Sequence, residues 1–116
     1  MTEPRFDALI HPATRLSLVA LLAAAEWVEF AFVRDTMALS DSALSKQLSG
    51  LEDAGYLEVH KEGRGRHRRT VVRLSKRGRA AFEGHVAALE QMLNTHRASE
   101  SGSRRIAFGE ARPRPA

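Results

Sequence analysis

The chain has 116 residues, of which 43% are hydrophobic and 28% charged, and its formal net charge is +4. This length suits one domain, and the lack of cysteine excludes disulfides and thiolate metal sites. The N-terminus has no basic segment followed by an apolar run, so we expect no signal peptide. The apolar run LSLVALLAAA has about half of the roughly twenty residues that a bilayer span needs, so we expect a buried helix there. The expected location is cytoplasmic.

The positive charge is concentrated in one segment. Residues 1–60 carry four basic and nine acidic side chains, a net charge of −5, and residues 80–116 carry five and four, a net charge of +1. Residues 61–79 carry nine basic side chains and one acidic one, a net charge of +8. A basic patch of this kind is typical of proteins that bind a polyanion.

The first predicted element is a helix that begins near Pro12, a residue suited to a first helical turn, and ends at Ala25. It is apolar on most sides, which is expected of a helix buried in a core or in an interface. The positions that make it so are Leu16, Leu18, Val19, Ala20, Leu21, Leu22 and Ala23. A very short strand at Trp27-Val28 and a short helix over 29–36 are expected to follow.

The next helix has clear predicted ends. Ser40 or Asp41 can cap its first N–H groups, and Gly55 suits the left-handed residue after its last turn. Its buried stripe consists of leucines at helical spacing, Leu44, Leu48 and Leu51.

The opposite face of this helix carries mostly short side chains, which would let it enter the major groove of DNA. Ser42, Ser45 and Lys46 could then reach phosphates or base edges, with Ala43 beside them, and the helix N-terminus favours a phosphate. Gln47 could pair with adenine if it turned outward. The alternative is that the serines serve only solubility and capping.

Two alternating segments, 56–61 and 70–74, are joined by a loop that contains glycine, which predicts a β-hairpin. The loop collects arginines and one histidine: Arg64, Arg66, His67, Arg68 and Arg69. Because arginine suits phosphates and narrow minor grooves, we expect this loop to bind DNA. The alternative is a solvated charged loop.

Ser75 is expected to cap a long final helix, which carries an apolar seam with 4-3-4 spacing: Phe82, Val86, Leu89 and Leu93. Lys76, Arg77 and Arg79 occupy its first turn, where the helix dipole disfavours cations. Either these side chains contact the DNA backbone, or the fold tolerates the small electrostatic cost of cations at the helix N-terminus. The domain is expected to span residues 6–95, and residues 97–116 to form a disordered tail.

The predicted order is mainly α with a small β-hairpin, which is that of a winged helix-turn-helix domain with a long C-terminal helix. The motif L-S-x-x-L-x-x-L-x-x-x-G-Y-L, the basic hairpin and the motif L-[ST]-x-x-G-R carry a family resemblance. Together with the segment HPATRLSLVALL they make residues 6–93 resemble the winged-helix transcriptional regulators of the MarR/ArsR-like superfamily. The nearest likeness is to small single-domain DNA-binding members.

This resemblance implies a homodimer that binds double-stranded DNA and represses or activates transcription. It implies that the major groove is read by Ser42, Ala43, Ser45, Lys46 and Gln47, and that the loop 63–69 is the wing. It also implies that dimerisation uses the first and last helices, through Leu9, Leu18, Leu22, Phe82, Val86, Leu89 and Leu93. After the L-[ST] of the last helix, relatives often carry acidic residues, whereas this chain has Lys76 and Arg77. The difference suggests tighter or less selective binding to the DNA backbone.

Other chemistry has little support in the sequence. The five histidines form no i, i+4 pair, there is no nucleophile elbow, and the carboxylates are scattered, so we expect no metal site, no cofactor and no enzyme. Trp27, Phe30 and Phe32 either line a pocket for an unknown small-molecule effector or belong to the core. Two functions remain as alternatives to a transcriptional regulator: a winged-helix module that binds an acidic protein, and a nonspecific nucleic-acid-binding protein.

Overall fold

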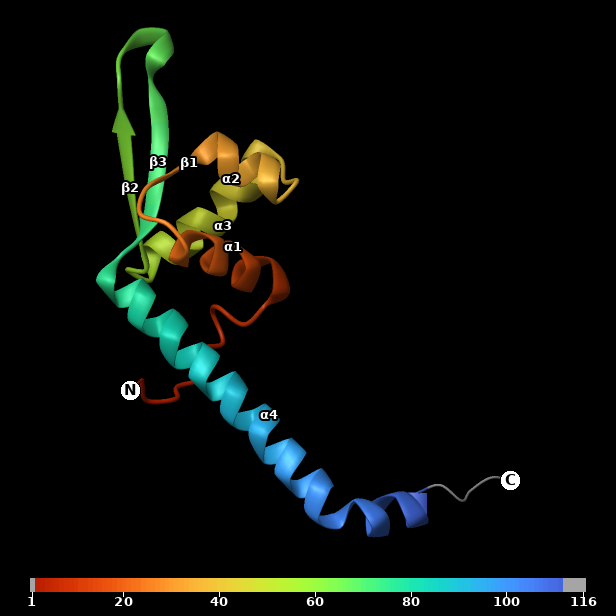
Figure 1. Ribbon diagram of the computed structural model, residues 1–116. Coiled ribbons are helices and arrows are strands. Elements are labelled where there is room, and N and C mark those ends of the chain that lie inside the picture. The colour runs from red at the N-terminus through yellow and green to blue at the C-terminus, as the bar shows by residue number, and fades with distance from the viewer. Residues whose placement is uncertain (1, 112–116) are drawn as a thin grey trace.

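A computed structural model describes residues 2–111, with side chains through residue 99. Helices α1 (Ala13–Ala23), α2 (Phe30–Thr36) and α3 (Asp41–Asp53) precede a hairpin of β2 (Leu57–Glu62) and β3 (Arg69–Leu74), and α4 (Lys76–Ala111) follows (Figure 1). The two-residue strand β1 (Val28–Glu29) lies one residue later than predicted, and a 3₁₀ turn, η1 (Gly65–His67), lies at the end of the hairpin. The predicted fold class, mainly α with a β-hairpin and a long last helix, is confirmed.

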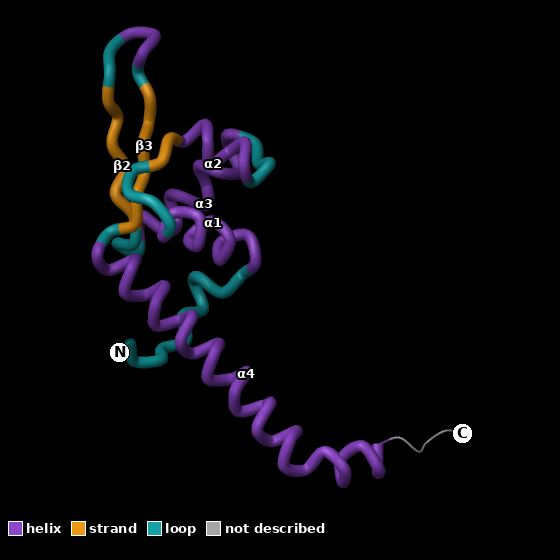
Figure 2. Tube along the Cα trace, in the orientation of Figure 1, coloured by secondary structure: helices purple, strands orange, loops and turns teal. Residues whose placement is uncertain are grey.

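The sheet places the hairpin against the helices. Within the described residues its strand order is β1-β3-β2, with antiparallel pairs throughout, so β3 is the central strand (Figure 2). Val72 lies opposite Val28 on one side and Val59 on the other, and these residues face the core. Successive side chains of a strand alternate between the two faces, so Arg69, Val71 and Arg73 lie on the other face, which we call the outer face of the sheet.

The ends of α3 and α4 are fixed by the residues that the sequence indicated. Ser40 Oγ accepts a hydrogen bond from the N–H of Ala43, so Ser40 is the cap of α3 and Asp41 its first residue. Gly55, at φ +82°, follows α3 in the left-handed region. Ser75 Oγ accepts from the N–H of Gly78 and donates to the carbonyl oxygen of Gly55, which joins the two helix ends.

The core is formed by α1, the buried stripe of α3 and the inner face of the sheet. Leu44 and Leu51 are fully buried and Leu48 nearly so, as predicted. Leu18 and Leu22 are also fully buried inside the protomer. The prediction that these two leucines lie in a dimer interface is therefore wrong, because they have no surface left to offer. Leu9 is half-buried against the same core.

Helix α4 leaves the core and projects away from the hairpin (Figure 1). It is helical through Ala111, whereas the sequence predicts that the helix ends near residue 96 and a disordered tail follows. The apolar periodicity that indicates a helix is lost after Leu93, but Arg, Ala and Glu favour a helix without it. Residues 112–116 of the expected tail lie outside the described residues. No helix within residues 2–111 is long and apolar enough to span a bilayer.

Candidate nucleic-acid interface

The exposed side of α3 carries the side chains that the sequence assigned to DNA. Ser42, Ser45 and Lys46 are exposed, whereas Ala43 is half-buried. The turn between α2 and α3 includes Ala38 at φ 54°, an uncommon conformation for a residue other than glycine. The two helices and this turn form a helix-turn-helix in which α3 is the exposed second helix.

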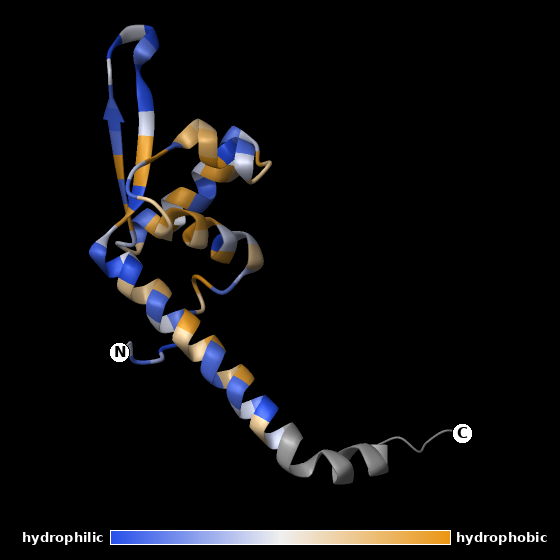
Figure 3. Cartoon of the chain, viewed as in Figure 1, coloured by the Kyte–Doolittle hydropathy of each residue, from blue (hydrophilic) through white to orange (hydrophobic). Residues whose placement is uncertain are grey.

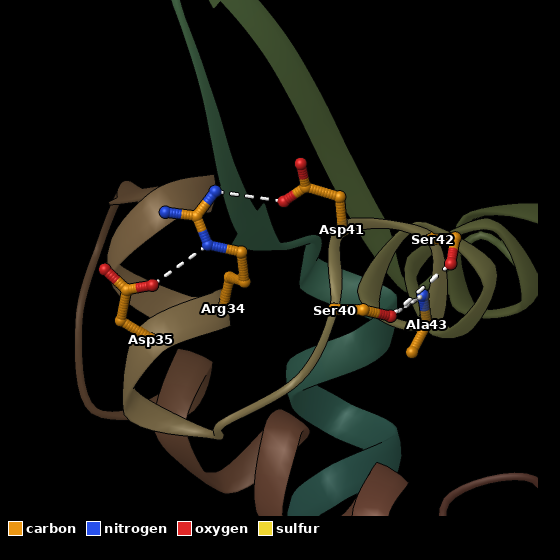
Figure 4. Close-up of polar contacts among 6 residues, drawn as sticks. All are labelled: Arg34, Asp35, Ser40, Asp41, Ser42 and Ala43. Carbon is orange, nitrogen blue, oxygen red and sulfur yellow. Dashed lines mark hydrogen bonds and ion pairs between the residues drawn. The ribbon is translucent and has the colours of Figure 1, made fainter.

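The N-terminal end of α3 is held to α2 by a charged contact (Figure 4). Arg34 donates from Nε to Asp35 and from Nη1 to Asp41, each at 2.9 Å. These hydrogen bonds raise the pKa of the Arg34 guanidinium above its ordinary value, with the bond to Asp35 contributing most. Asp41 also suits the positive end of the helix dipole. A phosphate approaching this helix end would therefore meet a carboxylate that is already paired with an arginine.

Gln47 does not point freely outward. Its side chain is half-buried, and its Oε1 accepts a hydrogen bond from Arg15 Nε of α1 at 2.9 Å. Arg15 also donates from Nη1 to the carbonyl oxygen of Leu9. Adenine recognition requires Gln47 to turn outward. In this structure its amide oxygen accepts the hydrogen bond from Arg15 instead.

A groove separates α3 from the hairpin and shows that they lie on one side of the molecule. It has a volume of about 390 Å³ and is lined by Asp41, Ser45 and Ser49 of α3, Lys61 of β2 and Thr70 of β3. The hairpin therefore rises beside the Ser45 edge of α3. This is the arrangement that a joint DNA-binding surface of helix and loop requires.

The wing tip, residues 63–68, is fully solvated and basic. All six residues are exposed, and the distal part of the hairpin is hydrophilic (Figure 3). Gly63 has φ +85°, and a Cβ there would overlap the carbonyl oxygen of His67, so the tight turn requires glycine. Within the described part of the chain, Arg64, Arg66 and Arg68 make no ion pair with the acidic side chains.

Arg69, the last basic residue of the predicted wing, has a different environment. Its guanidinium binds Glu62 Oε1 at 2.8 Å and Glu29 Oε2 at 2.9 Å. The hydrogen bond to Glu62, followed by the charge of Glu29, raises its pKa. The sequence places Arg69 among the DNA contacts, but the structure places it between two carboxylates.

The basic residues at the start of α4 lie away from the wing tip. Arg77 packs beside Gly55, at the opposite end of α3 from Ser42, and both Lys76 and Arg77 are exposed. Arg79 donates to the carbonyl oxygen of Ala23 at the C-terminal end of α1. That bond explains a cation in the first turn of α4, because Arg79 satisfies the negative end of another helix.

The aromatic residues near α2 form no shared pocket. Phe30 packs against the core, while Phe32 is 56% exposed. Trp27 lies against His60 and under the guanidinium of Arg73, on the outer face of the sheet.

A larger cleft, of about 770 Å³, which the sequence does not predict, lies between the N-terminal segment (residues 2–12) and α4. Asp7, Tyr56 and Arg77 are among its lining residues, and Tyr56 donates a hydrogen bond to Asp7. No sequence pattern joins residues so far apart along the chain.

A helix-turn-helix followed by a β-hairpin on a small sheet defines the winged helix-turn-helix class. The family described as winged helix DNA-binding domain matches residues 14–93, and the chain belongs to this family. It is a family of DNA-binding domains and not of enzymes.

The comparisons with individual proteins agree with this class. The chain is 26% identical over 84 residues to the uncharacterised protein MJ0432 of Methanocaldococcus jannaschii, covering 72% of this chain and 91% of that one. A transcriptional regulator homologue from Pyrococcus horikoshii OT3 shares the fold with a TM-score of 0.71 at 20% identity, over 75% of this chain and 86% of that one. The S. aureus MepR–DNA complex gives a TM-score of 0.65 at 12% identity, over 88% and 83%. Regulators of the MarR family are among the proteins that share the fold, as the resemblance implied.

Proposed function

We propose that this protein is a transcriptional regulator that binds specific double-stranded DNA as a homodimer. One observation carries the proposal: an unpaired basic wing tip stands at the end of a hairpin that borders the exposed side of α3. Membership of a DNA-binding family supports it, and a protein with the same fold has been solved as a complex with DNA.

In this proposal the major groove receives α3, with Ser42, Ser45 and Lys46 at phosphates and base edges and Ala43 at the edge of the contact. The wing tip lies on the backbone or in the minor groove through Arg64, Arg66 and Arg68, with His67 among them. Gln47, Lys76 and Arg77 are left outside the proposed surface, because Gln47 binds Arg15 and the two cations lie at the base of the hairpin.

The proposed dimer contact uses the apolar strip of α4. Phe82, Val86 and Leu89 are half-buried, whereas Met92 and Leu93 are 52% and 55% exposed. The side chains from residue 90 to residue 99 are all exposed, since α4 has left the core of its own protomer there (Figure 3). A second copy of the strip would cover these apolar side chains. Leu9, which the resemblance also assigns to the dimer contact, is half-buried and lies on the N-terminal segment.

The decisive experiment is the selection of bound sequences from a random pool of duplex DNA. A two-fold symmetric motif is expected, with half-sites about one or two helical turns apart. Equal recovery of all sequences would indicate a nonspecific nucleic-acid-binding protein. The absence of binding at low salt, where phosphate contacts are strongest, would favour a module that binds an acidic protein.

A further inference from the structure

Arg69 joins all the strands of the described sheet through one guanidinium. Its Nη1 donates to Glu29, which ends β1, while Nε and Nη2 both donate to Glu62, which ends β2. Arg69 itself begins β3. The planar fork of arginine can hold two carboxylates at once, which a lysine ammonium with its compact charge does less well.

The register of the sheet shows why this contact can form. Glu62 lies directly opposite Arg69 in the last pair before the loop, and Glu29 lies opposite Val71, two residues further along β3. Residues two apart on a strand share a face, so all the charged groups meet on the outer face. Because Glu29 directly precedes α2, the contact ties the stem of the hairpin to the start of the helix-turn-helix.

The wing tip beyond this contact is held only by itself within the described residues. Its backbone hydrogen bonds are local: the N–H of His67 donates to the carbonyl oxygen of Arg64, and the N–H of Arg68 to that of Gly65. None of its side chains is buried. The direction in which the tip points therefore depends on the stem, and Arg69 is the residue nearest the tip whose side chain bonds the stem to β1.

We infer that Arg69 is a positioning residue, which sets the angle of the wing relative to α3, and not a contact to DNA. Glu29, Arg69 and Glu62 together carry a net charge of −1, so a phosphate at Arg69 would have to displace two carboxylates. The unpaired arginines of the tip have no such competitors. The inference rests on the proposed function for its DNA measurements, but not for the measurement on the free protein described below.

The variant Glu29→Gln separates the two roles of Arg69 by the sign of its effect. If Glu29 helps to position the wing, its loss weakens DNA binding. If Arg69 contacts phosphate, the loss of Glu29 releases a cation and strengthens binding. Glu58→Gln is the matched control, because Glu58 pairs with Arg73 on the same outer face and loses the same charge.

The DNA experiment measures the affinity of each variant for a selected duplex over a range of salt concentrations. We expect Glu29→Gln to bind about two- to fivefold more weakly than Glu58→Gln, as suits the loss of an exposed ion pair. We expect Arg69→Gln to lose affinity while the slope of log K against log salt stays at the wild-type value. A slope reduced by about 0.9 in Arg69→Gln, or affinity in Glu29→Gln equal to or above that of Glu58→Gln, would overturn the inference.

Amide hydrogen exchange of the free protein tests the same inference without DNA. Arg69→Gln and Glu29→Gln should speed exchange in the distal parts of β2 and β3, whereas Arg66→Gln should leave it unchanged. Unchanged exchange in all variants would overturn the positioning role. A protein that binds no DNA but shows the expected exchange pattern would contradict the proposed function and leave the role of Arg69 in the fold intact.

Discussion

The Nε2 atom of His85 and the Nδ1 atom of His11 lie 3.2 Å apart, and the hydrogen bonds around them allow a single arrangement of protons. His85 Nδ1 accepts the backbone N–H of Asp7 at 3.0 Å, so this nitrogen carries no proton. A neutral imidazole must then carry its proton on Nε2, which donates to His11. Phe6 packs on both rings, so this cluster fastens the N-terminal segment to α4.

This cluster makes the stability of the protein depend on pH. Burial, followed by the nearby His11, lowers the pKa of His85, while Asp7 opposes the shift. The unfolded chain therefore takes up the proton first, at its ordinary pKa of about 6.5. The free energy of unfolding should fall as the pH drops below that value, by at most about 1.4 kcal/mol per pH unit, until the folded pKa is reached.

Urea unfolding at several pH values measures this effect. His85→Gln keeps hydrogen-bonding atoms but does not titrate. In this variant the free energy of unfolding should change less with pH, between pH 7 and the folded pKa of wild-type His85. His96→Gln on the same helix is the control, because His96 is exposed in α4. An equal pH dependence in wild type and His85→Gln would contradict the lowered pKa of His85.

Arg66→Ala should weaken binding to selected and random duplexes by a similar factor, because a wing contact to the backbone carries no sequence information. The slope of log K against log salt should decrease in magnitude by about 0.9. Arg97→Ala removes the same charge from exposed α4 and should leave the slope unchanged. Fluorescence anisotropy at several salt concentrations gives both quantities, and an unaltered Arg66→Ala slope would remove the wing tip from the interface.

Lys46→Ala should reduce the preference for the selected site over random DNA, because Lys46 lies on the exposed side of α3. A good base contact accounts for about 1–3 kcal/mol of discrimination, so the specificity ratio should fall by about fivefold or more. Lys76→Ala, at the base of the hairpin, is the matched control and should preserve the ratio. Competition assays with the two DNAs measure it. Equal effects of the two substitutions would place Lys46 outside the major groove.

Leu93→Glu should convert the proposed dimer to a monomer, because it places a charge in the exposed apolar strip of α4. The dissociation constant of the dimer should rise by at least about tenfold, with little change in the melting of the monomer. Phe32→Glu, at an equally exposed apolar position on α2, is the control and should leave the dimer intact. Analytical ultracentrifugation measures the assembly, and a Leu93→Glu protein that sediments as wild type would move the interface elsewhere.

Two glycines on helices should respond in opposite directions to alanine. At Gly78 an added Cβ would overlap the carbonyl oxygen of Tyr56, so Gly78→Ala should destabilise the fold by about 1–3 kcal/mol. At Gly50 of α3 nothing lies within 4 Å, so Gly50→Ala should stabilise it by about 0.5–1 kcal/mol. Denaturant unfolding compares them directly, and equal signs would contradict the close approach of α4 to Tyr56.

The features that the sequence predicted correctly depend on neighbours along the chain. The leucine stripe of α3, the cap at Ser40 and the left-handed Gly55 follow from helical spacing and local hydrogen bonding. The hairpin follows from alternation and from a loop containing glycine. Such patterns can be recognised without knowing how the elements pack.

The features that it missed depend on residues far apart in the chain. Arg69 meets Glu29 across 40 positions, and Arg79 reaches Ala23 across 56. The sequence predicts that Arg69 contacts DNA, and that Arg79 either contacts DNA or is tolerated at the helix N-terminus. Each of them instead binds a group of the protein itself. Charge counts locate a basic segment, but only the fold shows which of its cations remain unpaired.

The hydrogen bonds of Arg15 connect two parts of the molecule that have different proposed roles. One side of its guanidinium holds Gln47 in the middle of α3, and the other binds the carbonyl oxygen of Leu9, which lies in the turn at residues 8–10. A displacement of residues 7–10 must therefore either carry Arg15 with it or break one of these bonds. Arg15 thus couples the position of α3, the helix that faces DNA in our proposal, to the position of the N-terminal segment.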